Sequence, residues 1–584
     1  MNEGWNLDPI YKGFDDPAYV ADMAALKQLV ADFTAFAAEL DKMEPIEGLR
    51  KGVQLQEALS ELSTLSGYAN LRSATDAKNP EPGSYMGRVM SIRSGLAAPM
   101  AAYNAWIVGL PNLMELVRGD EYLKNYEFYF AGKAESARYQ LSGEAEAVMA
   151  KLGMSGGSAW GKLQGYLTST APVHYRGTVT NLSSIRNLAY DADPQVRKDA
   201  FEAELACYEA IKEPVAHALN AIKLETISQC QLRGYDSPLD RTLHHSDLKR
   251  ETLEAMLGAM DEYLPKFWQY LKAKAKALGH ENGLPWYDLF APMGNASTTF
   301  TTEEAKAYLL KQFSTFDEEL TQMVATAFDD AWIDFYPRDG KRGGAFCSSI
   351  HKIGQSRILT NYDGMFTDVV TLAHELGHAF HNQCIREHLP LNRGYSKPVA
   401  ETASTFNECV VMNAAIKSAE SKDEKIALIE SQLQDATQII CDIYSRYRFE
   451  TMVFENRESK FMNADTLAGY MITAQKQSYG DGLDHNCLHP YMWICKSHYY
   501  GPTFYNFPYA FGGLFARGLY AQYEKEGAAF VPKYKKLLYT TPVATAEDAA
   551  KVAGIDLTDK YFWRSALQTV AQQIDLFCEL VEEK

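Results

Sequence analysis

Cysteine pairs, long apolar runs and positive charge are all scarce in this chain of 584 residues. Its nine cysteines are odd in number, widely scattered and form no CxxC pair, which argues against a disulfide framework and excludes a thiolate zinc ribbon. No stretch approaches about 18 uninterrupted apolar residues, so we expect no helix that crosses a membrane. The opening residues, MNEGWNLDPIYKGFDDP, lack the basic and apolar segments of a secretory signal. These absences together predict a cytoplasmic protein.

Acidic residues outnumber basic ones, with 75 Asp and Glu against 57 Lys and Arg, a formal net charge of −18. A chain of this charge repels phosphate backbones and anionic lipid head groups, so we expect neither nucleic acid nor a membrane surface as its partner. Hydrophobic residues make up 46% of the chain and charged residues 23%. These are ordinary values for a globular protein and exclude a disordered or fibrous one.

Helical periodicity dominates the rest of the pattern. Apolar residues between 23 and 40 recur at spacings of three and four, and the tract 421–456 contains no Pro or Gly and carries an apolar stripe. Only three short tracts favour β-strands, at 173–179, 343–347 and 356–360. The sequence therefore predicts a mainly α-helical protein with a small β-sheet.

A glycine-rich run, Gly153-Met154-Ser155-Gly156-Gly157, is the clearest interruption of the helical pattern in the first third of the chain. No internal repeat, low-complexity tract or Pro-rich linker offers a stronger boundary. We therefore predict two lobes, an N-terminal helical lobe of residues 1–155 and a larger lobe of residues 156–584.

The motif that indicates chemistry is TLAHELGHAFH at residues 371–381. His374 and His378 are four residues apart, so on a helix they share one face and can hold one metal ion. Glu375 stands where HExxH metallopeptidases carry the general base that takes a proton from the attacking water. Thr367 is suited to cap this helix at its N-terminus. The spacing predicts a zinc site, with one ion per chain.

A third ligand is needed, and His381 cannot supply it. It lies seven residues after His374, about 10 Å along a helix, which is too far for convergence on one ion. The metzincin pattern is also excluded, because it requires Gly at the position of His381 and His at the position of Cys384.

A carboxylate from a second helix remains, in the segment KPVAETASTFNEC at residues 397–409. Pro398 suits the first turn of a helix, which would carry Glu401 and Glu408 on one face. The 23 residues that separate Glu401 from His378 allow one helix to end and another to return antiparallel. We expect Glu401 to complete a His₂Glu site with an open position, and Glu408 to orient a ligand histidine.

A run rich in hydrogen-bond donors follows at residues 498–513, HYYGPTFYNFPYAFGG. Peptide hydrolysis builds negative charge on the carbonyl oxygen, which imidazole and phenol donors can stabilise. His498, Tyr505 and Tyr509 are the candidates for this role. On composition alone, core packing of the aromatic residues remains an alternative. The roles of His485 and His489, close to this run, stay open.

Two of the strand-like tracts lie just before the HELGH motif, at 343–347 and 356–360. They could form a hairpin whose edge binds substrate as an additional strand, through backbone hydrogen bonds. Gly343 and Gly344 would let a substrate backbone approach closely. Ordinary hairpin packing is an equally good interpretation of these tracts.

Three blocks together, SRILTNYDGMFTDVVTLAHELGHAFH, ETASTFNE and HYYGPTFYNFPYAFGG, resemble the oligoendopeptidase F family, relatives of thimet oligopeptidase and neurolysin. The opening WNLDPIYKGFDDP and the segments LRGYDSPLD and WYDLFAPM are also similar to this family, so the resemblance runs the full length. It implies a two-lobed helical zincin-type metallopeptidase with a deep channel, zinc on the channel floor and a small β-sheet near the active site. It also implies endopeptidase action on short unstructured peptides.

Carried over by position, the resemblance implies that His374, His378 and Glu401 bind the metal, that Glu375 is the base, and that His498, Tyr505 and Tyr509 are the donors. Phe507 departs from the family, since relatives often carry another tyrosine there. Two alternatives remain. One is a zinc exopeptidase, an aminopeptidase or dipeptidase-like enzyme, although the tract GGAFC has no carboxylate to bind a free amine. The other is a helical binding protein with an inactive motif.

Overall fold

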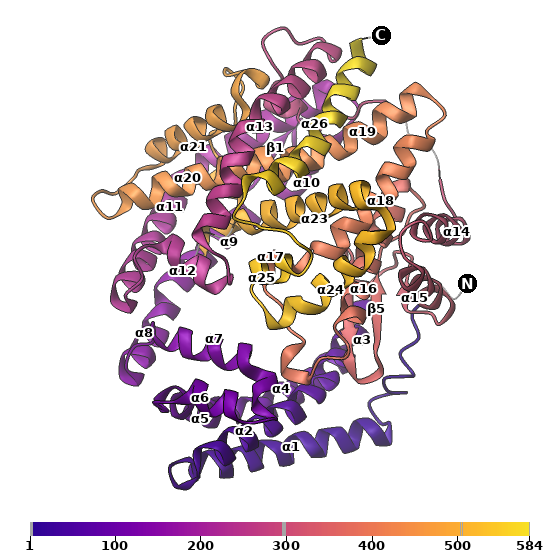
Figure 1. Ribbon diagram of the computed structural model, residues 1–584. Helices are drawn as coiled ribbons and strands as arrows, with labels where there is room; N and C mark the ends of the chain where they lie inside the picture. Colours follow the sequence, from indigo (N-terminus) through magenta and orange to yellow (C-terminus); the bar gives the residue numbers. More distant parts are fainter. Residues whose placement is uncertain (1–3, 295–298, 503, 505, 583–584) are drawn as a thin grey trace.

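The structure is a computed structural model that describes residues 4–294, 299–502, 504 and 506–582. Helices dominate the described residues, and the strands form two small sheets (Figure 1). The mainly helical class predicted from the periodicity is confirmed. No helix among these residues is both long and apolar enough to cross a membrane.

The first helices form one end of the molecule, shown in indigo and violet in Figure 1. Leu26 and Phe33, from the stripe predicted between residues 23 and 40, are fully buried there in a separate apolar core. Three of these helices begin with proline in the first turn, which needs no backbone N–H. The helices are α1 (Pro17–Ala38), α2 (Pro45–Glu61), α3 (Thr64–Thr75), α4 (Pro80–Ser94), α5 (Ala97–Gly109), α6 (Leu113–Gly119) and α7 (Glu127–Ala137).

Two helices, α8 (Gly143–Ser155) and α9 (Gly157–Thr170), lead from this end to the rest of the chain. The loop predicted at residues 153–157 is wrong in extent, because Gly153 to Ser155 continue α8 and only Gly156 interrupts the two helices. The backbone N–H of Gly157 donates to the carboxylate of Glu225, which stabilises the start of α9. The division into lobes at this point stays a prediction.

The remaining helices build two further apolar cores. The larger core includes the tightly packed pairs of α13 with α26, α16 with α18, and α23 with both α18 and α26. The helices are α10 (Leu182–Asn187), α11 (Pro194–Arg233), α12 (Pro238–His245), α13 (Arg250–Ala277), α14 (Thr302–Phe313), α15 (Glu318–Asp329), α16 (Phe366–Cys384), α17 (Lys397–Ala400), α18 (Thr402–Ser418), α19 (Lys422–Thr437), α20 (Ile443–Arg457), α21 (Ala464–Tyr479), α22 (Met492–Cys495), α23 (Phe507–Glu526), α24 (Val531–Thr540), α25 (Ala546–Lys551) and α26 (Lys560–Glu582).

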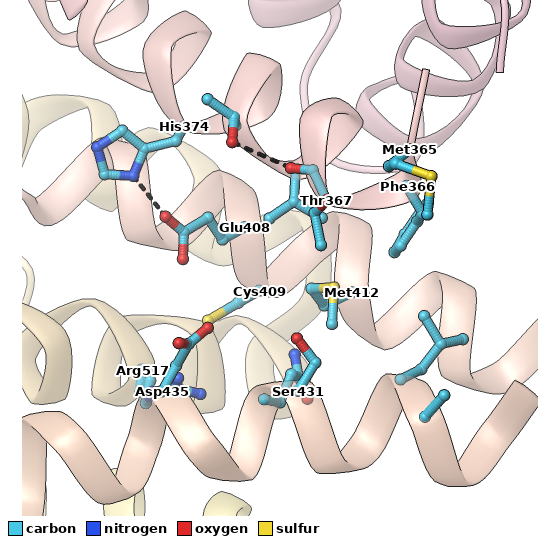
Figure 2. A pocket seen from close by; sticks show the side chains of 15 residues that line it. Met365, Phe366, Thr367, His374, Glu408, Cys409, Met412, Ser431, Asp435 and Arg517 are labelled. Atoms are coloured by element: carbon cyan, nitrogen blue, oxygen red, sulfur yellow. Dashed lines mark hydrogen bonds and ion pairs between the residues drawn. The ribbon is translucent and has the colours of Figure 1, made fainter. Parts of the chain in front are cut away.

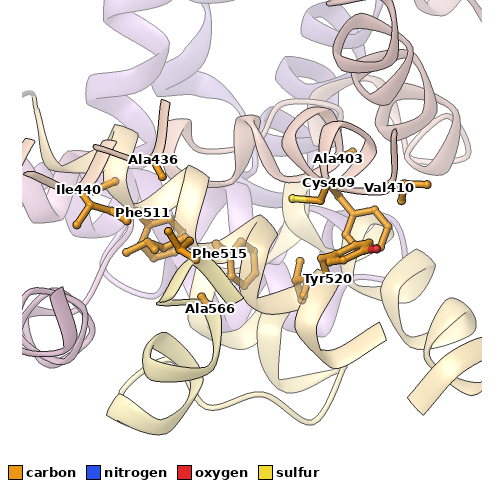
Figure 3. Close-up of a cluster of buried hydrophobic side chains, with 14 of the residues drawn as sticks. Ala403, Cys409, Val410, Ala436, Ile440, Phe511, Phe515, Tyr520 and Ala566 are labelled. Atoms are coloured by element: carbon orange, nitrogen blue, oxygen red, sulfur yellow. The ribbon is translucent and has the colours of Figure 1, made fainter. Parts of the chain in front are cut away.

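Figure 3 shows where α18, α19, α23 and α26 meet in this core. Phe511 and Phe515 of α23 lie among Ala436, Ile440 and Ala566, all of them buried. Interiors packed this closely transmit displacements rather than absorb them. Helix α18, which carries Glu408 and begins directly after Glu401, therefore rests on a rigid support.

The tract 421–456 is helical throughout, as predicted, but not uniformly α-helical. Between α19 and α20 the segment η7 (Gln438–Asp442) is a π-helix. An inserted π turn rotates the side chains beyond it relative to those before it, and such turns are frequent at functional sites.

Both sheets differ in detail from the predicted strands. The tract 173–179 is a two-stranded hairpin, β1 (Val173–Tyr175) and β2 (Thr178–Thr180), because Arg176 and Gly177 adopt positive φ angles and reverse the chain. The second sheet has the order β3-β5-β4, with β3 (Ile333–Asp334), β4 (Phe346–Ile350) and β5 (Gln355–Leu359).

In this second sheet β4 and β5 pair antiparallel, as the predicted hairpin requires, and β3 adds a short parallel partner. The predicted first strand, 343–347, begins three residues too early, because Gly344 has a φ of 77° and lies outside the ladder. Among the described residues, one edge of β4 has no partner strand.

Candidate active site

The HELGH motif lies in α16, whose first residue is Phe366. Thr367 was predicted to cap this helix. Instead, it lies within the first turn. The carboxylate of Asp368 does the capping, because it accepts hydrogen bonds from the backbone N–H groups of Asp363 and Met365 at 2.9 and 3.0 Å. Apolar residues such as Leu372 and Leu376 are buried on the face of the helix that points away from His374 and His378.

The chain turns after α16 and returns through α17 and α18. Glu401 and Glu408 were predicted to share one continuous helix. Instead, Glu401 occupies the junction between α17 and α18, with φ −90° and ψ 9°. The hydroxyl of Ser404 donates to its carboxylate at 2.8 Å. The break in the helix and this hydrogen bond fix the direction of the Glu401 side chain.

A glycine inside the motif allows the two helices to cross closely. A Cβ atom at Gly377 would lie 2.4 Å from the carbonyl oxygen of Ala403 and 2.5 Å from the Cα of Ser404. Both atoms belong to the backbone of α18, so they cannot rotate out of the way. Only glycine permits this approach, which places the two histidines beside Glu401.

Three side chains converge at this crossing and could hold a metal ion. Nε2 of His374 and Nε2 of His378 lie 3.3 and 3.4 Å from the Oε2 atom of Glu401, and the three donor atoms lie within 4.8 Å of one another. Ligands at about 2.0–2.1 Å from a tetrahedral ion are separated by roughly 3.4 Å. The three residues predicted as ligands therefore fit such an ion in both distance and donor type.

The carboxylates around the two histidines favour positive charge at the point where the three donors meet. Nδ1 of His374 is hydrogen-bonded to Glu408, which directs Nε2 toward Glu401. Burial opposes protonation of His374, but its bonds to Glu401 and Glu408 outweigh burial and raise its pKa to about 10. Burial also opposes the charged form of Glu401, yet the two imidazoles hold its pKa well below its usual range. A bound cation would replace the proton on Nε2.

Glu375 is a buried carboxylate with an oxygen that is available to accept a proton. Its side chain is only 5% exposed, and its Oε2 atom has no hydrogen-bond partner among the described residues. Burial raises the pKa of its carboxyl, although the neighbouring His374 and His378 oppose the shift. Cys347 of β4 lies near enough for the Glu375 charge to add to burial in raising the pKa of its thiol. Strand β4 thus runs beside Glu375.

The predicted donors are partly brought together. His498 lies in η9 (Ser497–Tyr500), Tyr509 in the first turn of α23, and the Tyr509 hydroxyl lies 3.2 Å from Nε2 of His498. Burial, aided by Arg446, lowers the pKa of His498 and favours its neutral form. Tyr505 lies outside the described residues. Phe507 is buried in the core.

The start of α23 also approaches the crossing of α16 and α18. A Cβ atom at Gly512 would lie 3.3 Å from the Cβ of Glu401. Tyr509 precedes Gly512 by about one helical turn, so it lies on a neighbouring part of the same helix face. A glycine within a helix is a known indication of close packing. Nothing in the sequence, however, indicates that Gly512 packs against Glu401.

A cavity of about 500 Å³ opens beside His374 and Glu408 (Figure 2). Its walls come from the first turns of α16, the middle of α18 and the side of α19, with Met412 and Asp435 among the lining residues. Burial, together with the charge of Glu408, raises the pKa of Asp435 to about 6. Arg517 of α23 also lines the cavity and is 8% exposed. Sequence reasoning missed both charged residues, which lie far from the motif.

The other histidines near the motif point elsewhere. His381 is fully buried, bonds Thr541 at 2.8 Å through Nε2 and stacks on Tyr395. His485 bonds the carbonyl of Gly480. His489 is buried, with its Nε2 3.5 Å from Glu204, and lines a second cavity.

Two family models and several curated proteins match this chain. The model of the family described as "Peptidase family M3" matches residues 187–569, and that described as "Oligopeptidase F" matches residues 111–170. Oligopeptidase PepF of Bacillus subtilis is 24% identical, over 99% of this chain and 86% of the relative. An oligoendopeptidase F homolog of Borreliella burgdorferi is 23% identical, over 100% of this chain and 98% of the relative.

Solved structures show the same fold. The crystal structure of oligoendopeptidase-F from Enterococcus faecium has a TM-score of 0.72 at 17% identity. The match covers 97% of this chain and 99% of the Enterococcus chain. The crystal structure of a protein from Chlamydophila abortus has a TM-score of 0.88 at 20% identity, and the match covers 99% of this chain and 98% of that protein. The predicted two-lobed helical peptidase fold is therefore confirmed.

Proposed function

The chain belongs to peptidase family M3, and from that premise we propose that it is a zinc-dependent endopeptidase that hydrolyses internal bonds of short, unstructured peptides. The observation that carries the proposal is the convergence of two imidazole nitrogens and one carboxylate oxygen within 4.8 Å, beside a buried carboxylate. The names of the relatives, oligopeptidase and oligoendopeptidase F, support the same class of substrate.

Zinc is the ion that best suits the three donors. Two imidazoles and one carboxylate, with a fourth position left for water or substrate, are the donor set of catalytic zinc sites. Oxygen-preferring ions such as Mg²⁺ and Ca²⁺ would select carboxylates and carbonyls instead. When bound, the ion acts as a Lewis acid toward the peptide carbonyl and makes water a stronger acid.

The chain's own residues then handle the protons and the developing charge. Glu375 accepts a proton from the attacking water and returns it to the leaving amine, roles that a buried carboxyl of raised pKa can fill. Glu408 keeps the His374 ring oriented through Nδ1. Neutral His498 and the Tyr509 hydroxyl are the donors for the carbonyl oxygen as it becomes negative.

The substrate is proposed to lie extended along β4. The open edge of this strand offers backbone groups for pairing, and Cys347 in the same strand lies beside Glu375. Backbone pairing reads peptide conformation rather than side chains, which suits unstructured peptides of varied sequence. All nine cysteines are free, which favours a reducing compartment such as the cytoplasm.

The proposal is tested with an internally quenched peptide of about ten residues, roughly 33 Å when extended, blocked at both ends. We expect internal cleavage that a zinc chelator abolishes and added zinc restores. Cleavage that continues in the chelator would contradict the metal requirement. Cleavage only after the amino terminus or the carboxyl terminus is unblocked would favour the exopeptidase alternative.

A further inference from the structure

A second cavity, of about 280 Å³, is lined in part by Gln438 and Asp442 of η7, and its walls are rich in charged groups. The lining residues include Arg186, Arg197, Glu204, Asp442 and Lys496. They come from α10, α11, η7 and the segment before η9, which are far apart in sequence. No part of the function proposed above uses this cavity.

Nearly every charge in this cavity is already balanced. Arg186 pairs with Glu204 at 2.9 Å, and Arg197 pairs with Asp288 at 2.7 Å. Asp442 pairs with Arg446 on the next turn. These contacts neutralise the lining groups two by two.

Lys496 is the exception. In the part of the chain that the structure describes, it is the charged lining residue whose side chain makes neither an ion pair nor a hydrogen bond. Burial lowers the pKa of its ammonium group, and the partial attraction of Asp442 does not restore it. A half-buried cation with no partner is unfavourable unless an anion is supplied from outside the chain.

The cavity is connected to the candidate active site along one helical surface. Asp435 of α19 lines the first cavity, next to His374 and Glu408, and Gln438 lines the second, about 4.5 Å farther along the helix axis. Tyr190, in the second cavity, is close enough to Asp435 for that charge to raise its pKa beyond the effect of burial. On the other wall Lys496 precedes the donor His498 by two residues.

We propose that Lys496 binds a carboxylate of the peptide substrate, so that peptides carrying this group are positioned across the active site. The inference rests on the peptidase function proposed above. A carboxylate is the anion that a peptide brings, either at its C-terminus or on an Asp or Glu side chain. An ammonium group meeting a carboxylate in a partly buried site forms a strong, charge-assisted hydrogen bond.

The test compares peptides of one sequence, blocked at the amino terminus, that end in a free acid or in an amide. A second pair, both amides, differs by Glu or Gln near the C-terminus. We expect the wild-type protein to cleave the carboxylate-bearing member of one pair with kcat/KM about tenfold higher. The pair that shows the difference identifies whether the carboxylate is terminal or on a side chain.

Substitutions then assign the preference to Lys496. Lys496→Met should reduce the tenfold ratio to about one, and Lys496→Arg should keep most of it, because the cation is retained. The matched control is Lys476→Met, at an exposed lysine of α21, which should leave the ratio at about tenfold. Lys496→Met should melt no lower than wild type, since it removes an unpaired charge; a lower Tm would show that the ammonium serves the fold and would overturn the proposal.

Two other results would also overturn it: equal rates within both peptide pairs, or a ratio that survives in Lys496→Met. Failure of the peptidase function has a different signature, which is no cleavage of any peptide. The ratio is therefore also measured as Kd, by fluorescence anisotropy of labelled acid and amide peptides in the presence of a chelator. Equal Kd values for both pairs would reject the carboxylate site, whether or not the protein is a peptidase.

Discussion

The crossing of α16 and α18 and the opposite wall of the site, formed by α19, η7, η9 and the start of α23, are built in different ways. The crossing takes its four polar groups from residues 374 to 408, and a single glycine sets the separation of its helices. The opposite wall collects residues from Asp435 of α19 to Tyr509 at the start of α23. The candidate metal donors are therefore encoded by local spacing, whereas the surface proposed to meet the substrate is encoded by the tertiary fold.

The largest expected effect separates chemistry from metal binding at the crossing. Glu375→Gln should lower kcat by about 10³-fold or more, because the amide cannot accept the proton, while zinc content is unchanged. Steady-state kinetics and metal analysis by mass spectrometry check both expectations. Retained activity would remove Glu375 from the role of base, and lost zinc would make the variant uninformative about chemistry.

The opposite wall is tested by Tyr509→Phe. Loss of one donor to the developing negative charge should reduce kcat about 10²-fold with little change in zinc content. The hydroxyl is also the group that contacts His498, at 3.2 Å. An unchanged kcat would show that the aromatic run serves packing, the alternative that composition left open.

Glu408 tests how far the crossing depends on a residue outside the three donors. Glu408→Ala should weaken zinc binding about 10- to 100-fold, because the His374 ring loses the acceptor at Nδ1. Glu408→Gln keeps an accepting oxygen and should weaken it less. Competition with a chelating dye gives the affinities; equal affinities for all three proteins would exclude the orienting role.

Gly377 tests whether helix separation sets the site. Gly377→Ala forces the backbone of α18 away, and we expect a loss of roughly 1–3 kcal/mol in stability together with weaker zinc binding. The matched control is Gly469→Ala in the middle of α21, where a Cβ would meet nothing within 4 Å, so the protein should gain about 0.5–1 kcal/mol. Thermal unfolding compares the two; a stable Gly377→Ala with normal zinc affinity would contradict the close crossing.

The smallest effect concerns Asp435, in the cavity beside Glu408. Its pKa of about 6 lies above the value of an unfolded Asp, so its charged form opposes folding at pH values above about 6, and the opposition vanishes below about pH 4. Asp435→Asn should therefore raise Tm relative to wild type at pH 8 and have little effect at pH 4. An equal shift at both pH values would show that the charge is not responsible.

The local part of the site was predictable from the sequence, and the reasons are visible in particular residues. His374 and His378 follow from the 3.6-residue period, and Glu401 from the length of chain needed for an antiparallel return. The cap at Thr367 was wrong because α16 already begins at Phe366, and Asp368 accepts hydrogen bonds from the backbone N–H groups of Asp363 and Met365. The strand at 343–347 was wrong in its start because Gly344 adopts a positive φ.

The rest of the site was not predictable, because its residues are ordinary in their local context. Asp435 occupies a helix whose sequence carries no motif, Arg517 lies beyond the end of the donor-rich run, and nothing in the sequence around Lys496 indicates that it lines a cavity. Gly377 was inside the motif, but its role depends on the α18 backbone, which no spacing rule places. Such residues become recognisable only when the helices are packed.

The central claim is that one ion at the α16–α18 crossing makes this chain an endopeptidase, and a zinc titration tests it most directly. Metal-stripped protein is titrated with zinc while internal cleavage of a doubly blocked peptide is followed. The account predicts that activity rises from near zero and levels off at about one equivalent per chain. Activity that is independent of zinc, or that requires a second equivalent to appear, would contradict it.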